Sequence, residues 1–127
     1  MPTVEISSGE LVDKLTILEI KERRLTSPAA VANVKRELAA LNAALGALCP
    51  PAAFNALKRE LAAVNASLWD IEDRIRAKEA ARIFDDEFVQ LARSIYHNND
   101  KRAALKREIN VLLKSDLIEE KQYTPYR

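Results

Sequence analysis

His97 is the only histidine in the sequence and Cys49 is the only cysteine, and this restricts the chemistry that the chain can support. Zinc sites are built mostly from several histidine and cysteine ligands, so no site of that kind can be assembled here. A Ser-His-Asp triad would have to use His97, and a disulfide within the chain is excluded. We therefore expect no catalytic residues, no metal site and no cofactor.

Pairs of carboxylates at helical spacing could present oxygen atoms to a divalent cation. Helical pyrophosphohydrolases hold magnesium with a Glu-Glu-x-x-Glu segment that is followed by Glu-x-x-Asp. Here Glu-Glu occurs only at residues 119–120, whereas Glu-x-x-Asp at residues 10–13 comes first. Because this order departs from the magnesium pattern, we expect ion-paired helix surfaces instead. The pairs are Glu10 with Asp13, Glu19 with Glu22, and Asp70 with Asp73.

Cationic side chains offer a second kind of chemistry, in which arginine and lysine from several helices converge on an anionic metabolite, as in small helical mutases. Arg102, together with Lys14 and Arg74, could hold such a substrate inside a bundle. The alternative is that Arg102 pairs with a carboxylate of another helix. We favour the pairing, because an unpaired guanidinium inside a bundle is strongly destabilising.

Arg102 belongs to the seam of a long predicted helix, where apolar residues recur at alternating spacings of four and three. The register of this seam also includes Asn98, so two polar residues occupy positions where leucine or isoleucine is expected. A polar layer of this kind destabilises a bundle unless its groups find hydrogen-bonding or ion-pair partners. It therefore indicates either a feature that fixes the register of the helices or a binding site. The apolar seam residues are Phe84, Phe88, Leu91, Ile95, Leu105, Ile109 and Leu112.

Polar and aromatic residues surround this layer. If the chain turns back near residue 83, Trp69 and Asp70 should lie within a turn or two of Tyr96 and Asn98. Trp69 is expected to pack under the first helix, with a contact to a partner protein as the alternative. The candidate ligand or partner zone consists of Lys14, Trp69, Asp70, Asp73, Arg74, Tyr96, His97, Asn98, Asn99 and Arg102.

The elements that must position this zone are helices. With 48% hydrophobic residues, 31% charged residues and only 2 glycines, the composition predicts an all-α fold, and 127 residues suffice for a single domain, residues 1–127. Ser7, Ser27 and Asp85 are typical N-cap residues. They predict helices over residues 8–25, 28–48 and 86–113, and Pro50 and Pro51 separate the second helix from one that runs to about residue 82.

The last two helices, each about 28 residues and so about 42 Å long, are joined by a short turn, which predicts an antiparallel hairpin. The fold is therefore expected to be an antiparallel helical bundle on this hairpin, partly covered by the two shorter helices, with extended N- and C-terminal tails. Leu117, Ile118 and Tyr123 are expected to dock the C-terminal tail on the bundle. Residues 35–42 recur almost unchanged at 58–65, which we interpret as convergent helix-forming surface and not as a binding motif.

The charges nearly cancel, with 20 Lys and Arg against 19 Asp and Glu. A net charge of +1 provides no field for nucleic acid or an anionic membrane, so neither is expected as a partner. No apolar run approaches the roughly 20 residues that span a bilayer, and the N-terminus lacks the features of a signal peptide. We expect a cytoplasmic protein.

Three segments resemble an uncharacterised family of small all-helical bacterial and phage proteins, a domain of unknown function. They are residues 4–21 (VEISSGELVDKLTILEIK), 68–79 (LWDIEDRIRAKE) and 88–102 (FVQLARSIYHNNDKR). The resemblance implies no activity and no catalytic residues.

Two functions remain open at this point. The first is a non-catalytic helical interaction or scaffold protein with coiled-coil character, which self-associates as a homodimer and could bind another protein. Its support is that long amphipathic helices, only partly covered, leave an apolar strip. The second is a small helical enzyme, mutase-like or metal-dependent hydrolase-like, that acts on an anionic metabolite. Whether the protein is an enzyme stays open, and the absence of a catalytic signature leans against it.

Overall fold

Four α-helices make up the computed structural model, which describes residues 1–126 and has no β-strand among them. They are α1 (Ser8–Arg24), α2 (Pro28–Ala47), α3 (Phe54–Ala80) and α4 (Asp86–Leu112). The predicted all-α class and the order of two short helices followed by two long ones are confirmed. Each helix ends close to its predicted end, because caps and prolines mark these positions in the sequence.

The predicted N-caps close the first turns of α1, α2 and α4. The Ser7 hydroxyl accepts from the backbone N–H of Glu10 at 3.1 Å, and the Asp85 carboxylate accepts from that of Phe88 at 3.0 Å. Ser27 does the same for α2, with Pro28 at the first helical position. Each cap satisfies an N–H group that has no partner inside its own helix, which is why these helices begin where they do.

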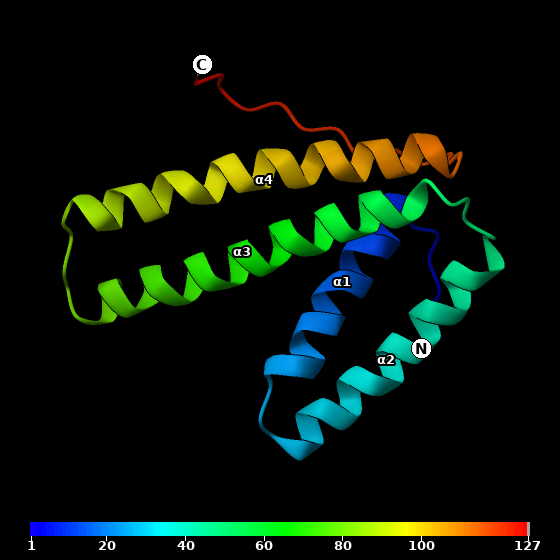
Figure 1. The fold of residues 1–127 in the computed structure, drawn as a ribbon, viewed down its shortest axis with the longest axis horizontal. Coiled ribbons are helices and arrows are strands. Elements are labelled where there is room, and N and C mark those ends of the chain that lie inside the picture. The colour runs from blue at the N-terminus through cyan, green and yellow to red at the C-terminus, as the bar shows by residue number, and fades with distance from the viewer. Residues whose placement is uncertain (127) are drawn as a thin grey trace.

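The helices form two units. The hairpin consists of the antiparallel helices α3 and α4, and the arm consists of α1 and α2 (Figure 1). Within the arm α2 packs on α1, and α1 also packs on both helices of the hairpin. The prediction that the shorter helices cover part of the hairpin is confirmed, but the cover comes from α1, while α2 lies on its outside.

The hydrophobic core lies where the arm meets the hairpin. Leu15, Leu61 and Ile109 have no exposed surface there. The half of the hairpin near its turn, residues 71–95, extends beyond the arm (Figure 1), and we call it the distal half. Its apolar side chains are less deeply buried, and Phe84 at its end is 58% exposed. The core residues that cluster are Leu11, Val12, Leu15, Leu45, Phe54, Leu61, Leu105 and Ile109.

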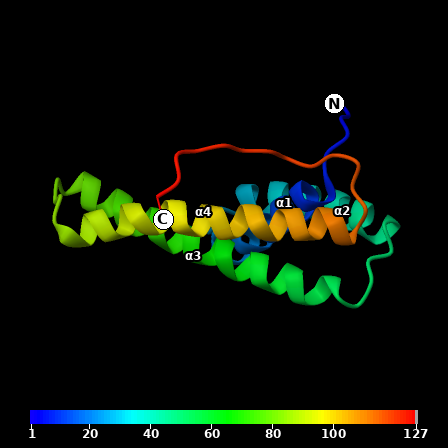
Figure 2. The same ribbon diagram turned by 90° about the horizontal axis from the view of Figure 1, so that it is seen from above.

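The C-terminal tail leaves α4, turns back and runs alongside it (Figure 2). The prediction that Leu117, Ile118 and Tyr123 dock this tail is wrong, because all three are exposed. Polar and aromatic contacts hold it instead. Lys121 pairs with Asp100 at 2.9 Å, and the ring of Tyr126 contacts the rings of Tyr96 and His97 on α4. An extended tail forms few backbone contacts, so it can reach across polar surface without burying its apolar residues.

Candidate functional site

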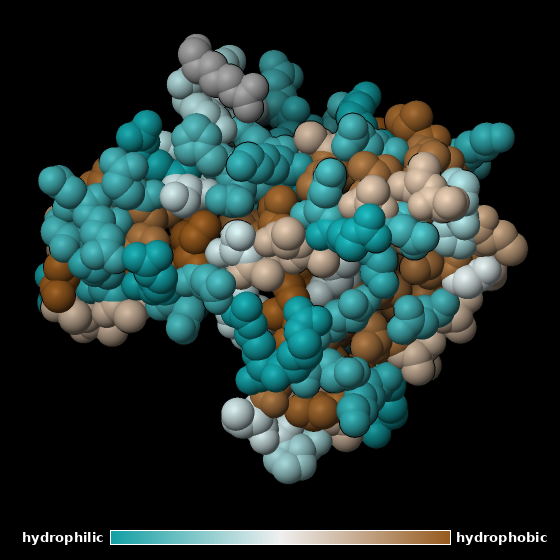
Figure 3. All heavy atoms as spheres, in the orientation of Figure 1, coloured by the Kyte–Doolittle hydropathy of each residue, from teal (hydrophilic) through white to brown (hydrophobic). Residues whose placement is uncertain are grey.

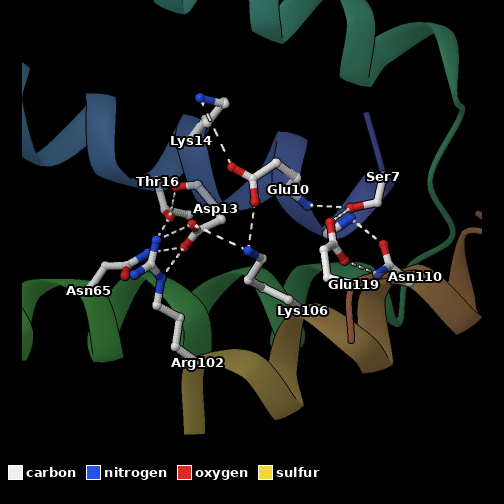
Figure 4. A network of polar contacts seen from close by, with 11 residues as sticks. Ser7, Glu10, Asp13, Lys14, Thr16, Asn65, Arg102, Lys106, Asn110 and Glu119 are labelled. Carbon is white, nitrogen blue, oxygen red and sulfur yellow. Dashed lines mark hydrogen bonds and ion pairs between the residues drawn. The ribbon is translucent and has the colours of Figure 1, made fainter. Parts of the chain in front are cut away.

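A network of polar side chains joins α1 to α3 and α4 at the point where the arm meets the hairpin (Figure 4). At its centre is Asp13, which is 1% exposed. Arg102 donates to both carboxylate oxygens of Asp13, at 2.9 Å from Nε to Oδ1, and Asn65 Nδ2 donates to Oδ1 at 2.9 Å. We call this network the polar junction; its members are Glu10, Asp13, Thr16, Asn65, Arg102 and Lys106.

The remaining members extend the junction along α1. Lys106 Nζ donates to Glu10 Oε2 at 2.6 Å and lies 3.9 Å from Asp13 Oδ2. Asn65 Nδ2 also donates to Thr16 Oγ1 at 2.9 Å. Two carboxylates thus face two cations, so the charges inside the junction balance.

The junction determines the protonation state of Asp13. Burial raises the pKa of the Asp13 carboxyl group, whereas hydrogen bonds from Arg102 and Asn65 lower it. The positive charges of Arg102 and Lys106 also lower it, and these interactions together outweigh burial, so the pKa of Asp13 is lowered from its ordinary value. Its carboxylate in turn raises the pKa of Arg102. Both partners are therefore fixed in their charged forms.

Local sequence explains why the helices approach so closely here. Gly9 lies in the first turn of α1, and a Cβ atom at this position would lie 2.4 Å from the backbone oxygen of Lys106. Only glycine permits α1 and α4 to come this near. Its N–H donates to Asn110 Oδ1 at 2.6 Å, and Asn110 Nδ2 donates to Glu119 of the tail at 2.9 Å. The start of α1 is thus held by α4 and by the tail.

The polar junction is a closed structure. Among residues 1–126, every buried side-chain nitrogen or oxygen has a hydrogen-bond partner. The expectation that Arg102 pairs with a carboxylate of another helix is confirmed, with Asp13 as that carboxylate. Asn98, the other polar seam residue, donates to the backbone oxygen of Ser94 in its own helix at 2.8 Å. The charged groups of the junction are paired with one another, which suits them to fix how α1 sits on the hairpin.

Beside the junction the surface is hollowed between α1 and the distal half of the hairpin (Figure 3). This hollow, which we call the notch, has a volume of about 600 Å³. Apolar side chains from all three helices form part of its wall, and carboxylates, amides and guanidinium groups form the rest. The lining residues are Ile17, Ile20, Asn65, Leu68, Trp69, Glu72, Asp73, Arg76, Ile95, Asn99 and Arg102.

The charges at the notch do not cancel. Arg76 pairs with Glu72 at 3.1 Å, and Arg102 is neutralised by Asp13. Asp73 makes no ion pair within residues 1–126, so its negative charge is left over. A cationic or apolar group therefore suits the notch better than an anion.

The structure divides the predicted zone among several surfaces. Trp69, Asp73, Asn99 and Arg102 line the notch together. The Trp69 ring also contacts α1, as expected, with the guanidinium of Arg24 5.9 Å from the ring centroid.

The other predicted residues point elsewhere. Tyr96 and His97 contact Tyr126 of the tail, each with ring centroids 4.9 Å apart. Three more form exposed ion pairs: Lys14 with Glu10 at 4.0 Å, Asp70 with Arg24 at 2.6 Å, and Arg74 with Glu87 at 2.8 Å. Lys14, Arg74 and Arg102 therefore do not converge on one point.

Sequence reasoning missed the importance of Asn65, Lys106 and Asn110. A signal existed for Asn65, because it lies four residues after Leu61 and three before Leu68, at the spacing of a seam. It is thus a polar seam residue of α3, comparable with Arg102 of α4. Lys106 begins a Lys-Arg-Glu sequence that also occurs within residues 35–42 and 58–65, the repeat that we interpreted as helix-forming surface.

Within residues 1–126, at least one member of each predicted carboxylate pair forms an ion pair, whereas Glu22 and Asp73 form none. Glu19 contacts Lys58 at 3.0 Å, for example, and the described residues contain no group of three or more His, Cys, Asp or Glu side chains arranged to hold a metal. None of the helices in this part of the chain has the length and apolar character of a transmembrane segment.

Comparison with known proteins adds the family but no activity. Residues 2–126 match a family described as one of unknown function (DUF6165). No curated protein and no solved structure shows significant similarity to the chain. Function must therefore be argued from the surface of the chain itself.

Proposed function

Because the chain belongs to the DUF6165 family, whose function is unknown, we propose a function from its geometry: a non-catalytic helical interaction protein that associates with a second copy of itself. The observation that carries the proposal is the uncovered distal half of the hairpin. Its α3 and α4 helices continue past the arm, and no third helix packs on them there (Figure 1).

The total surface area supports self-association. A compact monomer of 14.3 kDa is expected to expose about 6,800 Å². This chain exposes 8790 Å², which is about 2,000 Å² more. A stable interface of ordinary size takes about 800 Å² from each partner, so the excess is large enough to supply one.

The composition of the exposed surface points the same way. Ile83, Phe84 and Val89 are all at least 46% exposed and fall within seven residues of sequence at the turn of the hairpin and the start of α4. Large apolar groups that gather on one part of a surface usually mark a contact. Two hairpins that pack through their distal halves would form a four-helix bundle with coiled-coil packing, which would cover these residues.

The alternative, an enzyme for an anionic metabolite, has less support. The cations at the notch are already neutralised, and the charge left over there is that of Asp73. Lys14 and Arg74, the other cations considered, lie in exposed ion pairs away from Arg102. An anionic substrate would have to displace Asp13 from Arg102, and Asp13 is held by further hydrogen bonds from Asn65.

We further propose that the protein works in the cytoplasm of a bacterium or of a cell infected by a phage, as the resemblance of the sequence implies. Cys49 is exposed and unpaired, which suits a reducing compartment. Cell fractionation with an antibody to the native protein tests this location.

The oligomeric state tests the main proposal. Light scattering coupled to size-exclusion chromatography should give twice 14.3 kDa at micromolar concentration. Dilution should shift the mass toward that of the monomer. A monomer mass over the whole concentration range would refute self-association.

A further inference from the structure

We propose that the tip of each hairpin seats in the notch of the partner copy, so that two reciprocal contacts of this kind build a twofold dimer. The tip is Arg82, Ile83 and Phe84, and the notch is the hollow beside Trp69. This inference rests on the proposed self-association and adds how the two copies recognise one another.

The tip is an ordered turn from which the apolar side chains of Ile83 and Phe84 project. The N–H of Arg82 donates to the backbone oxygen of Glu79, and that of Ile83 donates to Lys78, each at 3.0 Å, so two bonds fix the turn. Lys78 also pairs with Asp85 across the turn at 2.8 Å. Because the turn is already ordered, little conformational entropy is lost when its exposed side chains are buried by a partner.

Phe84 is the main anchor of the tip. The residue is 58% exposed, and its ring rests edge-on against that of Phe88, with centroids 5.2 Å apart, which supports it in a projecting position. Ile83 beside it is 46% exposed. An aromatic ring that is held rigidly and left largely in water is the kind of group that dominates the binding energy of an interface when it enters an apolar pocket.

The notch is complementary to the tip in shape and in charge. It is concave, and Ile17, Leu68 and Trp69 supply apolar wall against which a phenylalanine ring can pack. Its uncompensated charge is negative, on Asp73. The tip carries Arg82, which forms no ion pair in the part of the chain that the structure describes. A tip in the notch would therefore bring together two opposite charges that otherwise lack partners.

Geometry makes the contact reciprocal. About 17 Å of helix separate Trp69 from the end of α3 at Ala80, and this length is the same in both copies. If two hairpins lie antiparallel about a twofold axis midway along this segment, each tip arrives at the notch of the other. Both notches and both tips are then occupied, and no apolar end remains free to propagate a chain of copies.

The first test is mutation of the tip. Phe84→Asp should weaken the dimer at least about thirtyfold, because it removes a hot-spot side chain and places a negative charge near Asp73. Its matched control is Val111→Asp, an apolar-to-acidic change at an exposed position of α4 outside the distal half, which should leave the dimer unchanged. Circular dichroism melting shows whether each variant keeps its fold.

The second test is charge exchange between tip and notch. Arg82→Glu and Asp73→Arg should each weaken the dimer, and the double variant Arg82→Glu/Asp73→Arg should restore affinity to within a few fold of the parent. Arg36→Glu, an exposed charge reversal on α2, should have no effect.

Crosslinking gives a direct readout. With Cys49 replaced by serine, the variant Asp73→Cys/Arg82→Cys should form a covalent dimer on mild oxidation, whereas each single cysteine variant should not. A bond between these positions within one chain is excluded, since Asp73 lies about two helical turns before the end of α3.

The outcomes distinguish the two proposals. A parent protein that is monomeric overturns both. A parent dimer whose affinity is unchanged by Phe84→Asp, or whose double cysteine variant fails to crosslink, overturns the tip-and-notch contact and leaves self-association standing. A parent dimer that shows both effects supports the reciprocal contact.

Discussion

Replacing Arg102 with alanine should destabilise the fold, because it leaves the carboxylate of Asp13 buried without its main partner. Breaking a fully buried ion pair costs about 3 to 5 kcal/mol. The side chain of Arg102 is 31% exposed, and Lys106 remains 3.9 Å from Asp13, so the loss should be smaller. We expect about 2 to 3 kcal/mol, which corresponds to a fall in melting temperature of about 10 °C for a chain of this size.

Urea unfolding monitored by circular dichroism at fixed protein concentration measures this loss. Arg107→Ala is the matched control, because Arg107 makes an exposed pair with Glu120 at 3.3 Å and its removal should cost less than about 0.5 kcal/mol. The double variant Arg102→Ala/Asp13→Asn should be less destabilised than the sum of its single changes, since the buried charge is gone. If Arg102→Ala unfolded with the same free energy as the parent, the polar junction would not be structural.

Further predictions concern the same region of the fold. Because the pKa of Asp13 is lower in the folded chain than in the unfolded chain, its ionised carboxylate stabilises the fold. This contribution is complete above the unfolded pKa of about 4 and is lost as the pH falls through the lower folded pKa. Acid unfolding curves should show the loss. Gly9→Ala should lower the free energy of unfolding by about 2 kcal/mol, because the added Cβ pushes α1 away from Lys106. Gly46→Ala, whose added Cβ meets no atom, should raise it by up to about 1 kcal/mol. Thermal melts measure both changes. Lys114→Gly should raise stability by about 1 kcal/mol, because Lys114 has a φ of 56° that glycine adopts more easily; an unchanged melting temperature would contradict this.

The polar junction determines how the arm sits on the hairpin, because its groups are paired with one another and balanced in charge. That placement creates the notch, since Ile17 and Ile20 of α1 line it together with residues of α3 and α4. We therefore expect changes in the junction to affect self-association indirectly, through the position of α1.

The sequence by itself determined the helices and their pairing. Caps at Ser7, Ser27 and Asp85 and the prolines after α2 act within a few residues, so their effects can be predicted without tertiary contacts. The short turn between the two long helices likewise predicted the antiparallel hairpin. The alternating spacing of apolar residues predicted the seam and singled out Arg102 as a polar group that must find a partner.

The tertiary structure alone decided which partner Arg102 has and which residues share a surface. Helical periodicity fixes the face on which a side chain lies, but not where along its length another helix crosses. Asp13 and Asn65 meet Arg102 only because α1 crosses the hairpin at that level, permitted by Gly9. The residues of the predicted zone are divided among several surfaces for a related reason. Consecutive residues on a helix point about 100° apart, so side chains that are neighbours in sequence around Asn98 lie on different faces of α4.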